Sequence, residues 1–339
     1  MRRLPRVITI TALVATFSLP AGCGSGAQEA SPARPAADRV TYLTAFGTFG
    51  REAYAYVALD KGYFREAGLD VTVQPGQGSG ENLAAVAGGR AHFAPVDFTA
   101  MLINAAGGKT AGVVTVAAIH QRTLAGLMAL GDGGIGRPKD LEGKTVGDAP
   151  GSVITMMFPT YAKLTGVDPA KVKWVSLEPA QLPANLASGQ VDAIGQYVVG
   201  QPTVRNAAKG KEVKVLPFGD VITDMYGLGL TTSTTLAKDK PDLVKRFTGA
   251  LLKGLAYAVE HPQEAAQILV KHHPAQNAVP AAAELSLMAP YVRPAGAEQV
   301  GAMDRDRVTR AIAVLREAGA FEGQVAPETV VSFDLAPKG

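Results

Sequence analysis

The run Phe46-Gly47-Thr48-Phe49-Gly50-Arg51 combines two aromatic rings, a hydroxyl and a guanidinium with two glycines, and such a set could hold a small solute. It follows a predicted strand at 40–45 and precedes a helical pattern at 52–61. In open parallel sheets, ligands bind beyond the carboxyl ends of the strands, where the free N–H groups and positive dipole of the next helix begin. We therefore expect Phe46, Thr48, Phe49 and Arg51 to contact a ligand, although the two rings could instead be core.

Residues at the same type of position recur further along the chain. Asp97 follows a predicted strand at 91–96, Gly151 and Ser152 follow one at 144–148, and Gln196 and Tyr197 end one at 191–196. We expect these five residues to contact the ligand as well. Asp97 and Ser152 could equally be helix N-caps, because Asp and Ser favour that position.

Gln121 and Tyr226 complete the candidate set, next to predicted strands at 112–119 and 226–231. Tyr226 could instead be core at a hinge. Arg51 and Arg122 are the cations near the predicted site, and each could instead be solvated or ion-paired at the surface.

The sequence has no constellation of residues for catalysis or for a metal. Its five histidines lack metal-ligand spacing, its one cysteine is Cys23, and no serine lies in a G-x-S-x-G motif. The segment GDGGIG at 131–136 matches a dinucleotide motif, but the residues after it leave no helix to receive a pyrophosphate. We expect no catalytic residue, no metal and no cofactor.

Two series of strands alternating with helices must position these candidates, and such alternation predicts largely parallel sheets. We expect an α/β fold of two lobes, each a mostly parallel sheet flanked by helices. Residues 39–129 and 226–334 are expected to form lobe 1, and residues 130–225 lobe 2, so that two crossings make a hinge. Helical spacing predicts helices in the tail, among them one at 304–318.

The first residues predict export. Arg2, Arg3 and Arg6 precede an apolar stretch at 7–19 and a small-residue cleavage site before Cys23. The segment resembles the signal of bacterial lipoproteins, which implies that residues 1–22 are removed and that Cys23 is lipidated. Pro20 stands where those signals usually have leucine, so a free cysteine is the alternative. Residues 23–38 are small and polar and should form a flexible tether.

Charge argues against a nucleic-acid partner. The chain has 33 basic and 30 acidic residues, and the arginines of the signal account for the excess. The mature chain is therefore close to neutral, whereas binders of phosphate backbones normally carry a basic excess.

The segments YVALDKGYFREAGLDVTV at 56–73, DLEGKTVGDAPGS at 140–152 and LASGQVDAI at 186–194, with the C-terminal helices, resemble a known family. They are similar to the substrate-binding proteins of ABC importers in the sulfonate-binding and NMT1/THI5-like group, over about Arg39 to Asp334. The resemblance implies a two-lobed type II periplasmic-binding-protein fold. It also implies a monomeric receptor on the outer face of the cytoplasmic membrane, which delivers a small-molecule solute to an ABC permease and its ATPase.

The candidate residues favour a flat heteroaromatic solute, similar to a pyrimidine precursor of thiamine. Phe46, Phe49, Tyr197 and Tyr226 could stack on a ring. Hydrogen bonds to ring nitrogens or to an amine could come from Gln196, Gln201, Asp97 and Ser152. The alternative is a small anion of the sulfonate, taurine or nitrate type, which would gain more from fixed cations.

An enzyme is the alternative from another class. The family also resembles the pyrimidine synthase of fungal thiamine biosynthesis, which shares this fold. That synthase carries a cysteine-rich motif, whereas the single cysteine here lies in the predicted tether. An export signal is also wrong for a cytosolic biosynthetic enzyme.

Overall fold

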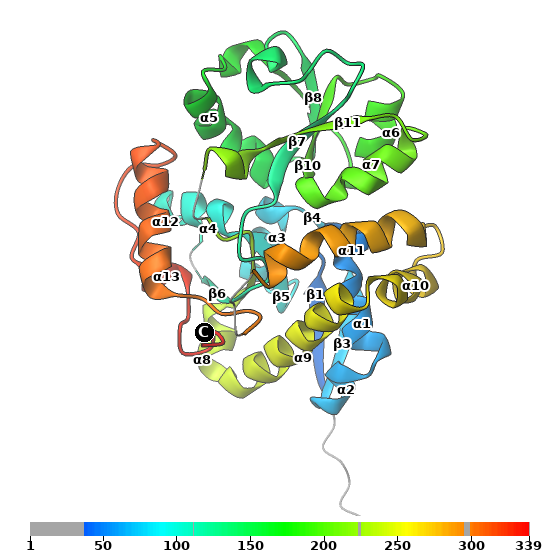
Figure 1. Ribbon diagram of the computed structural model, residues 1–339. Helices are drawn as coiled ribbons and strands as arrows, with labels where there is room; N and C mark the ends of the chain where they lie inside the picture. Colours follow the sequence, from blue (N-terminus) through cyan, green and yellow to red (C-terminus); the bar gives the residue numbers. More distant parts are fainter. Residues whose placement is uncertain (1–36, 111, 223–224, 295–298, 339) are drawn as a thin grey trace, which may run out of the picture. The chain divides into compact units, whose positions relative to one another are not determined.

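Two five-stranded sheets organise the chain (Figure 1). The computed structural model describes residues 37–338, except 111, 223–224 and 295–298. The predicted signal peptide, Cys23 and the tether up to residue 36 lie outside the described residues. Strand β1 begins at Asp38, so the last residue of the predicted tether already belongs to a sheet.

The first sheet is built from the early part of the chain and one later strand. Its order is β3 (Leu69–Gln74), β1 (Asp38–Leu43), β5 (Phe93–Asp97), β12 (Leu228–Ser233) and β6 (Val113–Ala118). β3, β1 and β5 are parallel, with Val40 opposite Val71, and β12 lies antiparallel between β5 and β6. All residues of β5 and β6 are buried, as expected for strands covered on both faces.

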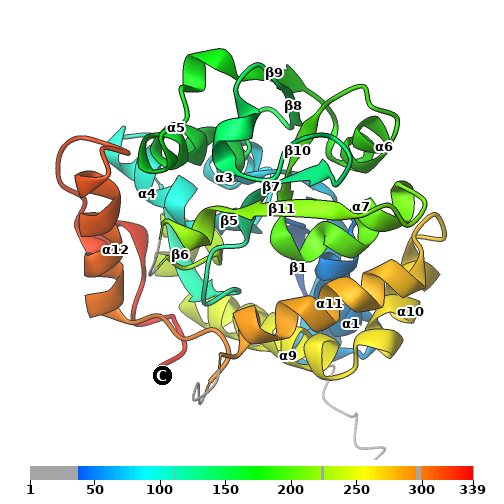
Figure 2. The ribbon, with the colours of Figure 1, turned by 45° about the horizontal axis from the view of Figure 1, so that its top comes forward.

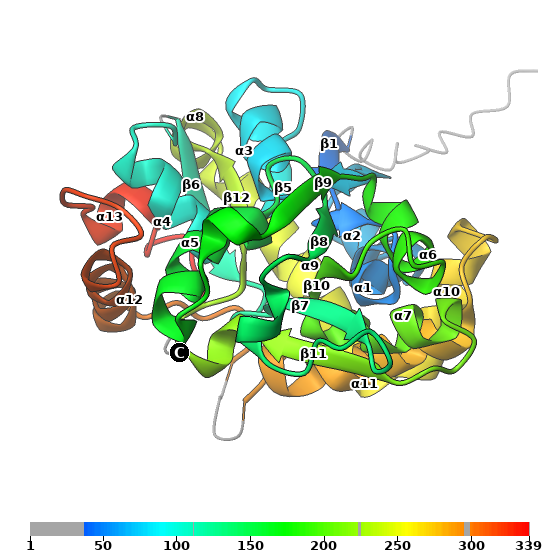
Figure 3. The ribbon, with the colours of Figure 1, turned by 90° about the horizontal axis from the view of Figure 1, so that it is seen from above.

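The second sheet has the order β11 (Val213–Pro217), β7 (Ala125–Leu130), β10 (Ala193–Tyr197), β8 (Thr145–Asp148) and β9 (Lys173–Ser176), which can be followed in Figure 3. β10, β8 and β9 are parallel, and β7 is antiparallel to both β10 and β11. Each sheet thus has one strand that opposes the other four.

Strand β7 corrects the expected lobe boundary. The boundary at 129–130 falls inside β7, where Tyr197 pairs with Ala125 and Ala193 with Ala129. The strand therefore belongs to the second sheet and not to lobe 1. An apolar run predicts a buried strand, but it carries no information on which sheet the strand joins.

The helices lie where the spacing of apolar residues predicts most of them. Those between the strands are α1 (Ala53–Asp60), α2 (Tyr63–Glu66), α3 (Ser79–Ala87), α4 (Phe98–Ala106), α5 (Val153–Thr165), α6 (Leu182–Ala187) and α7 (Gln201–Ala207). The tail has α8 (Thr234–Asp239), α9 (Pro241–Glu260), α10 (Pro262–His272), α11 (Ala278–Val292), α12 (Arg305–Glu317) and α13 (Pro327–Val330). Short 3₁₀ helices include η1 (Gly50–Glu52) and η5 (Val198–Gly200). We call the first sheet with α1–α4 the first lobe, and the second sheet with α5–α7 the second lobe.

Tail helices pack on both lobes (Figure 2). α9 lies against α1 and buries Phe247, whose ring stacks on Phe93 at 4.0 Å between centroids and on Phe64 at 5.3 Å. Gly254 permits this approach, because a Cβ atom there would lie 2.5 Å from the Tyr54 carbonyl oxygen. α11 packs on η1 of the first lobe and on α7 of the second.

Two segments connect the sheets, between β6 and β7 and between β11 and β12. They are hydrogen-bonded to each other, since Gly227 N donates to His120 O at 3.0 Å and Thr123 N to Met225 O at 3.0 Å. The C-terminal tail contacts these connecting segments at Gln121, whose Nε2 donates to the Ala302 carbonyl at 3.0 Å. Within the described ranges, no helix is long and apolar enough to cross a membrane.

Candidate functional site

A small pocket, with an open volume of about 10 Å³, lies between the two lobes. Its lining comes from both: Phe46, Gly78, Ser79, Ser152, Val153, Ile154, Gln196 and Tyr197. Every one of these residues lies where a strand gives way to a helix, so the pocket lies at the edge of each sheet where ligands of parallel sheets bind. A larger hollow of about 530 Å³ includes His92, which precedes β5, and therefore lies at the opposite edge of the first sheet.

Local hydrogen bonds explain how the lining residues are held. Ser152 is the N-cap of α5, and its Oγ accepts from Ile154 N at 3.2 Å. Ser79 Oγ accepts from Asp97 N at 3.0 Å, which joins the start of α3 to the end of β5. Two short antiparallel strands, β2 (Phe46–Gly47) and β4 (Gly76–Gln77), hold Phe46 in the pocket lining of the first lobe.

The two lobes touch through glycine backbones. Gly80 N, in the first turn of α3, donates to Gly151 O at 3.0 Å. A Cβ atom on Gly80 would lie 2.9 Å from that oxygen and 3.2 Å from Gly151 Cα. Gly151 itself has φ +70°, a conformation that side chains other than glycine rarely adopt. The approach of the lobes therefore depends on the absence of side chains here.

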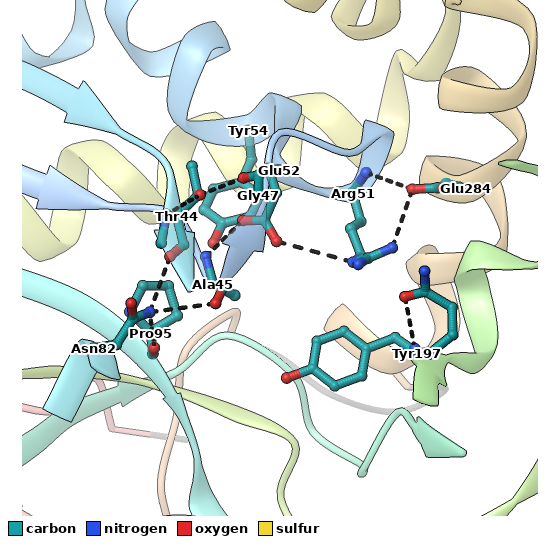
Figure 4. Close-up of polar contacts among 12 residues, drawn as sticks. Thr44, Ala45, Gly47, Arg51, Glu52, Tyr54, Asn82, Pro95, Tyr197 and Glu284 are labelled. Atoms are coloured by element: carbon teal, nitrogen blue, oxygen red, sulfur yellow. Dashed lines mark hydrogen bonds and ion pairs between the residues drawn. The ribbon is translucent and has the colours of Figure 1, made fainter. Parts of the chain in front are cut away.

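Arg51 is the central charged residue of the site, and it is not at the surface (Figure 4). Its guanidinium lies 3.6 Å from Glu284 and 3.9 Å from Glu52, over the Phe49 ring at 4.5 Å and the Tyr197 ring at 5.2 Å. The Arg51 backbone N–H donates to Glu284 Oε2 at 3.0 Å. None of its three guanidinium nitrogens has a hydrogen-bond partner in the part of the chain that the structure describes. Arg51 thus offers N–H donors beside the aromatic wall of the pocket.

Two buried carboxyls flank Arg51. Burial raises the pKa of Glu52 to about 7, against the opposing effect of the Arg51 cation. Burial also raises the pKa of Glu284, again opposed by Arg51. Glu52 Oε2 accepts from Ala45 N at 3.1 Å and so fixes the end of β1.

Asp97 and Asp148 are two further buried carboxyls, and both act on the Tyr197 hydroxyl. Asp97 caps α4 and accepts from Thr99 N at 2.9 Å, and burial raises its pKa to about 7. Asp148 accepts from Ala149 N and from Thr155 Oγ1 at 2.8 and 2.9 Å, and burial raises its pKa to about 6. Burial raises the pKa of the Tyr197 hydroxyl, and the charge of Asp97 raises it further.

His120 lies in the segment that connects β6 to β7, close to Arg51. Burial lowers its pKa to about 3, and the nearby Arg51 cation adds to the effect, so the ring is neutral at physiological pH. Both ring nitrogens lack a hydrogen-bond partner among the described residues. The described ranges contain no group of three His, Cys, Asp or Glu side chains arranged to hold a metal ion.

The structure brings most of the predicted site residues together. Phe46, Ser152, Gln196 and Tyr197 line the pocket. Phe49 stacks near Phe46, with ring centroids 6.4 Å apart. Arg51, Gly151 and Asp97 contact or adjoin lining residues, as described above. Asp97 and Ser152 are also helix N-caps, so the alternative role holds for both.

Three predicted residues lie away from the pocket. Thr48 faces the tail, where Gln276 Nε2 donates to its hydroxyl at 3.4 Å. Gln121 bonds to Ala302 and to Arg307. Tyr226 packs edge-on against Phe98 and accepts from Asp304 N at 2.9 Å. The C-terminal tail packs against this part of the molecule at these positions. Local strand and helix patterns do not predict such packing between distant segments.

The sequence analysis also misplaced Gln201 and missed several residues. Gln201 donates to the Val213 carbonyl at 2.9 Å, a contact within the second lobe. Arg122 is exposed over the Tyr291 ring, so the surface position expected for it is confirmed. Ser79 was detectable, because it follows β3 and begins a helix like the predicted residues. Glu284 carried no such signal, since it lies in a tail helix 233 residues from Arg51.

Comparison with known proteins identifies the family. A family model described as NMT1/THI5 like matches residues 52–265. The chain belongs to the NMT1/THI5-like family. It is similar to a formylaminopyrimidine-binding protein of Halalkalibacterium halodurans, with 27% identity over 66% of this chain and 67% of that protein. It is also similar to the riboflavin-binding protein RibY of Chloroflexus aurantiacus, with 27% identity over 79% of this chain and 76% of that protein.

A solved structure confirms the expected fold for this member of the NMT1/THI5-like family. The alkanesulfonate-binding protein SsuA of Xanthomonas axonopodis pv. citri, bound to MOPS, superposes with a TM-score of 0.68. The match covers 88% of this chain and 99% of that one at 16% identity, which is evidence of shared fold alone. The predicted two-lobed type II periplasmic-binding-protein fold is therefore confirmed.

Proposed function

We propose that this protein is the exported solute receptor of an ABC importer and that it binds a small, flat heteroaromatic solute without net negative charge, such as an aminopyrimidine. The solute lies in the pocket between the lobes, and the closed receptor delivers it to a permease. Two relatives named for binding a formylaminopyrimidine and riboflavin support a heteroaromatic class.

The distribution of buried charge carries this proposal. In the described part of the chain, the buried carboxyls are Glu52, Asp97, Asp148 and Glu284, and the buried cation is Arg51. The first three carboxyls and Arg51 act on the Tyr197 hydroxyl, and Glu284 pairs with Arg51, so all five surround one site. Burying charged groups is costly, and their concentration at one place marks a functional site.

This charge balance disfavours a compact anion. A bound sulfonate would meet one cation already paired with two carboxyls, and two further carboxyls nearby. A neutral ring avoids that repulsion and can stack on the aromatic wall, with about 0.5–1.5 kcal/mol per aromatic pair beyond area burial. The single observation that favours the anion instead is the set of unbonded guanidinium N–H groups of Arg51 in the described structure.

Mass spectrometry tests the receptor role against an enzymatic one. The purified mature chain is incubated with 4-amino-5-hydroxymethyl-2-methylpyrimidine, and both the protein-bound and the free fractions are analysed. A receptor should return the pyrimidine unchanged at about one molecule per chain. Conversion of many molecules per chain into a product would refute the proposal.

We also propose that the receptor is anchored to the membrane through Cys23. Diacylation gives stable anchoring where one acyl chain would be marginal. Replacing Cys23 with alanine should move the protein from the membrane fraction to the soluble fraction of fractionated cells. If the membrane-bound fraction is unchanged in the variant, the anchor is wrong.

A further inference from the structure

Asp97 has one carboxylate oxygen without a well-formed hydrogen bond among the described residues. Oδ1 accepts from Thr99 N and thereby caps α4. Oδ2 is buried without a hydrogen-bond partner in the described ranges, although the Thr99 side chain and the Ala100 N–H act on the carboxylate and oppose the rise in its pKa. Leaving a buried acceptor unbonded is costly, so a donor from a ligand would stabilise it.

Asp97 adjoins the pocket without lining it. Its backbone N–H is held by Ser79, a lining residue of the first lobe. Its carboxylate acts electrostatically on Tyr197, a lining residue of the second lobe. Asp97 is therefore linked to lining residues of both lobes.

Donors lie together in a second group near the pocket. Gln196 Nε2 and the Arg51 guanidinium nitrogens are buried and without hydrogen-bond partners among the residues described. A Cβ atom on Gly200 would lie 3.0 Å from Gln196 Cδ and 3.1 Å from Arg51 Nη1, which places these two groups side by side. Gln196 Oε1 already accepts from Tyr197 N at 2.9 Å, so its amide can present Nε2 as a donor.

Resting on the function proposed above, we propose that Asp97 is the specificity residue of the site and selects rings that carry an exocyclic amine. The amine donates to Asp97 Oδ2, and a ring nitrogen or carbonyl on the ligand accepts from Gln196 and Arg51. An oxo group in place of the amine would bring a second acceptor against the carboxylate. A site built to bond an N–H group rejects an analogue that lacks it, because its own polar groups are then left unpaired.

The test compares 4-amino-2-methylpyrimidine with 2-methylpyrimidin-4-one, which has an oxo group in place of the amine and a ring N–H in place of a ring nitrogen acceptor, by calorimetric titration at pH 8. The wild-type chain should bind the amino ring about 10- to 100-fold more tightly, as expected for loss of a hydrogen bond to a charged group. This comparison needs no substitution. Equal affinities for the two rings would overturn the proposal.

The Asp97→Asn variant provides a second test of this selectivity. Asparagine still caps a helix, so α4 should be preserved, but its amide can replace the acceptor at Oδ2 with a donor. The preference should then reverse toward the oxo ring. Asp168→Asn is the matched control, because Asp168 also caps a helical turn, accepting from Ala170 N at 3.1 Å, but its side chain is exposed and outside the site, so the variant should keep the wild-type ratio.

The outcomes separate this inference from the proposed function. Binding of the amino ring by both wild type and Asp97→Asn with an unchanged ratio would overturn the role of Asp97 and leave the pyrimidine receptor intact. Binding of taurine with no response to either ring would overturn the proposed function and the role of Asp97 together.

Discussion

Replacing Arg51 with methionine should lower the free energy of unfolding by about 3–5 kcal/mol at pH 7, because it leaves buried carboxyls without their cation. Arg51 is 1% exposed and lies between Glu52 and Glu284, which are 1% and 0% exposed. Methionine retains much of the length of the side chain, so the effect reports mainly lost charge. Urea denaturation followed by circular dichroism measures it.

The effect of this substitution should grow with pH. The pKa of Glu52 is already raised to about 7, and Arg51 opposes the rise, so its removal moves the pKa values of Glu52 and Glu284 upward. A carboxyl with a raised pKa in the fold binds more protons there than in the unfolded chain, so stability is lost as pH rises through that pKa. The loss should be smallest near pH 5 and largest near pH 8.

The exposed Arg122 is the matched control for Arg51. It lies over the Tyr291 ring at 5.1 Å, and Arg122→Met should change stability by no more than about 0.5 kcal/mol. A loss below about 1 kcal/mol for Arg51→Met, independent of pH, would mean that Arg51 does not compensate the buried carboxyls.

Replacing Gly80 with alanine should weaken solute binding by about 5- to 150-fold without lowering stability. The new Cβ would lie 2.9 Å from the Gly151 carbonyl oxygen, so the lobes could not keep this contact. Overpacking of this kind costs typically 1–3 kcal/mol. Gly80 lies in α3, where alanine is intrinsically favoured over glycine by about 1 kcal/mol, so the first lobe itself should not suffer. Calorimetric titration with the aminopyrimidine measures the loss.

Gly249→Ala is the matched control, because Gly249 also lies in a helix but has open space around the position of a Cβ atom. It should bind the solute as the wild type does. Small-angle scattering with saturating solute adds a direct readout: the wild type should become more compact and Gly80→Ala less so. Unchanged affinity in Gly80→Ala would show that the glycine contact plays no part in binding.

The sequence predicted the site to the extent that the site depends on local patterns. Phe46, Ser152, Gln196 and Tyr197 each end a strand or begin a helix, and alternation of apolar residues locates such junctions. The lining residue Ser79 also lies where a strand is followed by a helix, so the same rule could have predicted it. Ser152 caps α5 and also lines the pocket, so capping is compatible with a place at the site, and Asp97 caps α4 without lining the pocket.

Contacts between distant segments could not be predicted in this way. The pairing of Arg51 with Glu284 joins η1 to a tail helix, and periodicity indicates only that the tail helix has a buried face. Arginine is usually exposed, which favoured a surface position for Arg51. The strand β7 shows the same limit, because its apolar sequence suits either sheet. Gln121 and Tyr226 were wrongly predicted to lie in the site for a similar reason. They adjoin strands, but the C-terminal tail covers the ends of those strands, and the local pattern does not indicate this.

Calorimetric titration of the purified, ligand-stripped mature chain at pH 7 tests the central claim most directly. The titrants are 4-amino-5-hydroxymethyl-2-methylpyrimidine, riboflavin, taurine and methanesulfonate. We predict micromolar binding of the pyrimidine, weakened in Phe49→Ala, and no response to the two sulfonates. Micromolar binding of taurine or methanesulfonate, with no response to the pyrimidine or riboflavin and no loss in Phe49→Ala, would contradict the account.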